Sequence, residues 1–96
     1  MTNMDRIDLA HTRVEALTPL SAMKNLTELL LDNTPVSDVK PLAELEALEV
    51  LVLKETRVKD VAPLKALTKL KTLDLRGAPV ENSHTVMRPG LRVQEY

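Results

Sequence analysis

A 22-residue period in the apolar residues constrains the fold of this chain more than any other sequence feature. Several positions repeat at this step with no gap: Ile7, Leu29, Leu51 and Leu73; Leu9, Leu31, Leu53 and Leu75; Val14, Val36, Val58 and Val80. Met4 precedes Leu26 by the same step, which continues to Leu48 and Leu70. Such a period is typical of solenoids, in which each repeat buries its apolar side against its neighbours.

Each unit begins with a short apolar segment that alternates as a strand does. Leu29 and Leu31 lie two residues apart within segment 28–32, which puts them on one face of a strand. Segment 50–54 repeats this pattern and contains the β-branched Val50 and Val52. We therefore expect successive strands to pair in parallel, about 4.8 Å apart.

The residues after each strand predict a corner and then a short helical turn. Thr12, Thr34 and Thr56 follow the strands, and their hydroxyls can bond nearby backbone groups. Asp38 and Asp60 precede Pro41 and Pro63 by three residues, where a carboxylate can accept from the N–H groups of a beginning turn. Leucines three apart then form one side of a helical turn, at Leu42 and Leu45 and at Leu64 and Leu67.

The units LTELLLDNTPVSDVKPLAELEA and LEVLVLKETRVKDVAPLKALTK resemble the 22-residue class of leucine-rich repeats. Internalins and the regulatory subunit of a nuclear protein phosphatase use this class. The resemblance implies an α/β fold: a short right-handed solenoid with a parallel concave sheet and short helical or 3-10 turns on the convex side. Residues 1–80 are expected to form the repeats, with units starting near residues 4, 26, 48 and 70.

Residues 81–96 are interpreted as a C-terminal cap of the array, because the repeat pattern decays there. Asn82 replaces the capping Asp and is expected to serve the same purpose. Residues 83–88 predict a last helical turn, with Met87 in the core, and Pro89 and Gly90 stop it. Leu91 and Val93 are expected to form a final short strand.

Composition and charge argue against several classes of function. The net charge is -1 from 13 basic and 14 acidic residues, with no run of one sign, so no nucleic-acid face is expected. No apolar run approaches the roughly 20 residues that span a bilayer, so no membrane partner is expected. The absence of cysteine and of a signal-type apolar stretch near the N-terminus favours a cytoplasmic location.

No catalytic, cofactor or metal site can be assembled from the sequence. His11 and His84 are far apart in the repeat frame, and neither has a second ligand at metal spacing. Gly77 and Gly90 are the only glycines, so no phosphate-binding loop is present. We therefore expect a protein that is not an enzyme and binds no cofactor.

The concave sheet face is the candidate binding site, and its expected partner is an unidentified protein. Leu30, Val50 and Val52 flank the buried strand leucines and are predicted to form one exposed apolar patch. An apolar centre inside a charged rim is typical of protein-binding hot spots. The rim residues proposed for partner binding are Glu28, Asp32, Lys54, Asp74 and Arg76.

Two other functions remain open. The chain can act as a structural or self-associating unit, a homodimer formed through the edge strand that contains Ile7. Arg6 and Asp8 would point outward there and make such pairing less favourable. The resemblance also suggests a regulatory subunit of an enzyme such as a phosphatase.

Overall fold

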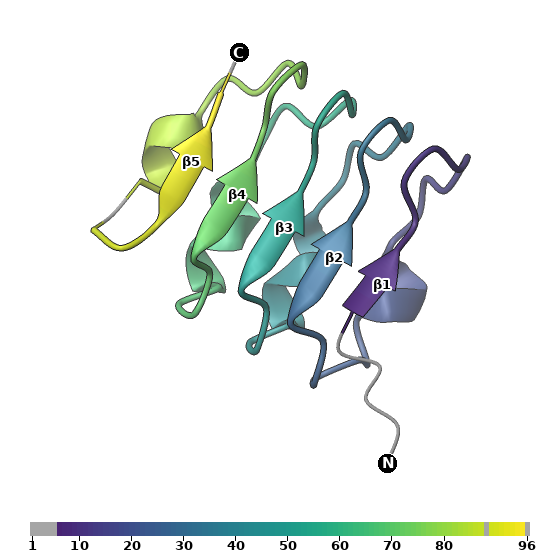
Figure 1. Cartoon of the computed structure of the whole chain (residues 1–96), viewed down its shortest axis with the longest axis horizontal. Helices are drawn as coiled ribbons and strands as arrows, with labels where there is room; N and C mark the ends of the chain where they lie inside the picture. The colour runs from purple at the N-terminus through teal and green to yellow at the C-terminus, as the bar shows by residue number, and fades with distance from the viewer. Residues whose placement is uncertain (1–5, 88, 96) are drawn as a thin grey trace.

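The structure is a computed structural model that describes residues 6–87 and 89–95 (Figure 1). Short strands alternate with short 3-10 helices along the chain. The strands are β1 (Arg6–Asp8), β2 (Glu28–Leu30), β3 (Val50–Val52), β4 (Thr72–Asp74) and β5 (Arg92–Gln94). The 3-10 helices are η1 (Thr18–Leu20), η2 (Lys40–Glu44), η3 (Ala62–Ala66) and η4 (Ser83–Thr85).

The strands form one parallel sheet of 5 strands in sequence order. Leu29 pairs with Leu51, and Leu51 pairs with Leu73, so the 22-residue period is the register of the sheet. The predicted final strand is present as β5, where Val93 pairs with Leu73. This last step is therefore two residues shorter than the others.

The 3-10 helices form a second layer behind the sheet, and the core lies between the two layers (Figure 1). Leu29, Leu51 and Leu73 are fully buried at the centres of their strands. Leu42, Leu45, Leu64 and Leu67 supply the other side of the core. Ile7 and Leu9 are only partly buried, because β1 has a neighbouring strand on one side only.

The predicted corners are confirmed at atomic detail. The hydroxyl of Thr34 donates to the carbonyl of Leu31 at 2.7 Å, and Thr56 and Thr12 make the same bond to the third residue before them. The carboxylate of Asp38 accepts from the Lys40 N–H at 3.0 Å, and Asp60 accepts from the Ala62 N–H at 2.9 Å. Each unit thus satisfies its corner backbone groups with its own side chains.

Two predictions for the last unit are wrong. Asn82 makes no side-chain bond to its own turn; it accepts from the Val61 N–H at 3.0 Å and donates to Asp60 at 2.7 Å, in the preceding unit. Met87 is 47% exposed, because Val86 takes the buried position of Leu64 and Met87 falls in the outward position of Lys65. Met4 and Arg88, which the sequence also assigned, lie outside the described residues.

The described segments contain no helix long and apolar enough to cross a membrane.

We predict that Thr34→Val lowers the free energy of unfolding by about 1 kcal/mol, because the substitution removes a buried hydrogen bond without changing side-chain volume. Thr12→Val is the matched control, since Thr12 makes the same bond at an exposed corner where water can replace the hydroxyl. Urea unfolding of the two variants measures the difference, and equal destabilisation by both would contradict the account.

Candidate partner-binding face

One face of the sheet is turned away from the core and is accessible to a partner. At the strand centres Leu29 and Leu51 are buried, whereas the residues on either side of them are partly exposed. The alternation continues past the strand ends: Leu31 and Leu53 are buried, while Asp32 and Lys54 are partly exposed. We call this surface the open face, formed by the outward residues of β1 to β5 and the residue that follows each of β1 to β4 by two positions.

Strand register brings the three predicted apolar residues together on the open face. Leu30 pairs with Val52 across β2 and β3, and Val50 lies two residues from Val52 on β3. All three are partly exposed, so they are available for contact without being required for the core. We call Leu30, Val50 and Val52 the apolar patch.

Two of the predicted rim carboxylates lie on β2 or two residues beyond its end. Glu28 accepts from the Arg6 guanidinium at 3.2 Å across β1 and β2. The Asp32 carboxylate lies 3.8 Å from the imidazole of His11, which is also 3.0 Å from the Asn33 side-chain nitrogen. These contacts join the first two units at the edge of the apolar patch.

Asp74 differs from the other rim residues because it is buried, with its side chain 9% exposed. Arg76 donates to both carboxylate oxygens, at 3.0 and 2.8 Å, and the Arg76 N–H donates to Oδ1 at 3.1 Å. Burial alone would raise the pKa of Asp74, but the Arg76 hydrogen bonds and the charges of Arg76 and Lys54 hold the pKa below its ordinary value of 3.8. This carboxylate already has its partners and is mainly a support for Arg76.

β5 adds Arg92 to the open face, a residue that sequence reasoning assigned to the cap. Arg92 pairs with Thr72 in the sheet and is exposed. The alternation of Arg92 with Val93 is the sequence signal that could have placed Arg92 on this face. The last unit is shorter, however, so Arg92 lies outside the 22-residue phase of the other strands. The open face is therefore five strands wide.

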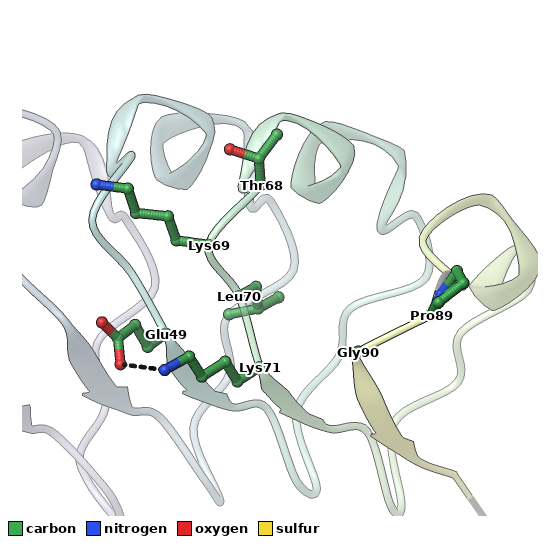
Figure 2. Close-up of a pocket in the computed structure, with 7 residues that line it drawn as sticks. All are labelled: Glu49, Thr68, Lys69, Leu70, Lys71, Pro89 and Gly90. Atoms are coloured by element: carbon green, nitrogen blue, oxygen red, sulfur yellow. Dashed lines mark ion pairs between the residues drawn. The ribbon is translucent and has the colours of Figure 1, made fainter.

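A shallow pocket of about 480 Å³ lies away from the open face, between the segments that lead into β4 and β5 (Figure 2). Leu70 lines it, and Gly90 occupies the register position that corresponds to Leu70. The Lys71 ammonium and the Glu49 carboxylate form an ion pair at 3.6 Å along its side. The pocket results from the missing leucine and from the shorter last unit.

Within residues 6–87 and 89–95, no group of three or more His, Cys, Asp or Glu side chains could hold a metal ion.

Comparison with solved structures identifies the fold. The chain is similar to internalin C2 from Listeria monocytogenes str. 4b F2365, with a TM-score of 0.76 and 26% sequence identity over 93% of this chain and 50% of that chain. A second internalin from that strain, inlF, gives a TM-score of 0.59 and 24% identity over 88% of this chain and 32% of that chain. No family model and no curated protein matches the sequence.

The predicted resemblance and fold class are therefore confirmed: this chain is a leucine-rich-repeat solenoid with an internalin-like fold. The chain spans half the length of internalin C2 and about a third of the length of inlF.

We predict that Asp74→Asn lowers the free energy of unfolding at pH 7 by about 1.5 kcal/mol, because it weakens charged hydrogen bonds but keeps the Oδ1 acceptor. The folded pKa of Asp74 is lowered, so its carboxylate stabilises the fold above pH 3.8, and this stabilisation is lost as the pH falls through the folded pKa. The difference in the free energy of unfolding between wild type and Asp74→Asn, measured by urea unfolding, should therefore become smaller below pH 3.8.

Asp8→Asn is the control, since Asp8 holds the same repeat position at an exposed site and bonds the Ala10 N–H at 3.0 Å. A gap for Asp74→Asn that stays constant across this pH range would contradict the role given to the carboxylate.

Proposed function

We propose that this leucine-rich-repeat solenoid is a protein-interaction module that binds a partner through the open face of its sheet. Solenoids of this kind are generally protein-binding modules and are typically not catalytic. The single observation that carries the proposal is the apolar patch of Leu30, Val50 and Val52, gathered by strand register at the middle of the sheet.

The fold does not require apolar side chains at these three positions. The core is complete without them, because Leu29, Leu31, Leu51 and Leu53 are fully buried behind the sheet. A polar side chain at position 30 or 52 would therefore leave the core packed, as Asp8 and Asp74 do in the neighbouring units. Apolar side chains there are best explained by contact with a partner, since charged residues are depleted from the centres of protein interfaces.

The rim supports the same function. Glu28, Asp32, Lys54 and Arg76 surround the apolar patch and remain at least partly exposed. Charges at an interface rim favour the correct partner and accelerate encounter more than they add affinity. The partner itself and a cytoplasmic location stay predictions.

Self-association through the β1 edge is less well supported. β1 lies at the edge of the sheet, but the Ala10 N–H beyond it already donates to the Asp8 carboxylate at 3.0 Å. Arg6 is held by Glu28 on the sheet. An incoming strand would have to displace or desolvate these groups.

Regulation of an enzyme such as a phosphatase also remains untested, because nothing in the open face is specific to it.

We predict that Val52→Glu weakens partner binding at least about tenfold, because it places a charge at the centre of an apolar contact. The fold should persist, because Val52 points away from the core and surface substitutions cost about 0.5 kcal/mol or less. Affinity capture from source-cell lysate, with circular dichroism to check folding, compares the variant with wild type.

Ala66→Glu is the matched control, since Ala66 is an exposed small apolar residue on η3, in the opposite layer. A protein captured by wild type and by Ala66→Glu but not by Val52→Glu identifies the partner and supports the open face. Capture by all three chains would refute the site, and unfolding of Val52→Glu would refute its outward orientation.

A further inference from the structure

The charges of the open face are arranged unevenly across the strands once the close ion pairs are set aside. Arg6 and Glu28 neutralise each other across β1 and β2 at 3.2 Å. Asp74 and Arg76 neutralise each other at 2.8 Å near the end of β4. The charges that remain on this face are those of Asp8, Asp32, Lys54 and Arg92.

These four residues divide by sign along the strand order. Asp8 lies on β1 and Asp32 two residues beyond the end of β2, whereas Lys54 lies two residues beyond the end of β3 and Arg92 on β5. Within the described part of the chain, no ion pair involves Asp8, Lys54 or Arg92, and Asp32 has only the His11 imidazole at 3.8 Å. Along the strand order the open face therefore changes from acidic at β1 and β2 to basic at β3 and β5, and the change falls beside the apolar patch, between the register neighbours Asp32 and Lys54.

We propose that the partner contributes an extended segment that crosses the strands with a defined order of charge. An apolar side chain of the segment lies on Leu30 and Val52, a basic residue faces Asp8 and Asp32, and an acidic residue faces Lys54. This assignment rests on the proposed function of the open face and specifies the chemistry of its partner.

The dimensions of the face set the length of the segment. Neighbouring strands lie about 4.8 Å apart, so β1 and β5 are separated by roughly 19 Å, which an extended chain crosses in about six residues. Asp32 and Lys54 follow Leu30 and Val52 by two residues, roughly 7 Å along the strands. A basic and an acidic residue of the segment, each within two to three positions of its central apolar residue, can therefore contact Asp32 and Lys54 while the apolar residue lies on the patch.

A second copy of the chain is the main competing occupant. An acidic side and a basic side around an apolar centre would also match a twofold-related copy of the same face. The open face measures only about five strand spacings by five residues, roughly 400 Å². Stable dimers bury about 800 Å² per partner, so the size of the face favours a short segment.

The test is selection from a displayed library of random 12-residue peptides against two immobilised chains, wild type and Lys54→Glu. The expected wild-type selection is enriched in an acidic residue and a basic residue flanking an apolar one. Peptides selected against Lys54→Glu should carry a basic residue where the wild-type selection has the acidic one, because residue 54 of the chain is then negatively charged. A synthetic wild-type consensus peptide should bind Lys54→Glu at least about tenfold more weakly, and a peptide with its acidic residue changed to Lys should recover binding to that variant.

The remaining outcomes separate this inference from the proposed function. If peptides are selected and lost with Val52→Glu, but their charge order is the same for wild type and Lys54→Glu, the open face binds and the charge assignment is wrong. If no peptide depends on Val52, both proposals fail. A dimer in sedimentation that is lost with Val52→Glu would show that a second copy occupies the face, which would overturn the segment.

Circular dichroism of Lys54→Glu must match that of wild type for the comparison to hold. If that variant does not fold, Asp32→Lys carries the same test on the opposite side of the patch, where the basic residue of the selected peptides should become acidic.

Discussion

The stacking of one unit on the next is the interaction on which the rest of this structure depends. A strand of three residues followed by one 3-10 turn cannot enclose its own leucines. When Leu29, Leu51 and Leu73 pair in register, each is covered by its neighbours and becomes fully buried. Ile7, with a strand on one side only, stays partly exposed, which shows how much of the burial comes from adjacent units. The absence of Phe and Trp fits this arrangement, because a stack of similar aliphatic side chains leaves no large gap for an aromatic ring.

This constraint also explains where the chain is free to vary. The leucines and corner threonines are fixed by the stack, whereas the outward positions of the strands are not. In the first unit this outward position is Asp8, and the corresponding residues of the following units are Leu30, Val52 and Asp74. Substitutions on the open face can therefore change the binding preference without disturbing the core. For this reason the apolar patch and the charges around it are the features that distinguish this solenoid.

Much of the fold could be predicted because the same signal occurs several times. The strands, the Thr34 and Asp38 corners and the final strand all follow from the period and from the local chemistry of each unit. The last unit could not be predicted in detail, because its return to the sheet is two residues short and a period cannot reveal a shortening at the end of an array. Met87 and Asn82 were misplaced for other reasons: Met87 keeps the 22-residue phase and falls in the outward position of Lys65, and Asn82 bonds back to Asp60 and Val61. The bidentate Asp74–Arg76 pair was also missed, since i and i+2 neighbours on one strand face can bond or remain apart, and only the side-chain geometry decides.

The most direct test of the central claim, that the open face is the binding surface, is amide chemical-shift mapping as the captured partner is titrated into the labelled chain. Binding at the open face should give the largest changes at Leu30, Val50, Val52 and Lys54, with small changes along η2 and η3. Large changes confined to η2 and η3, with the strand residues unaffected, would show that the partner binds the opposite layer and would contradict the account.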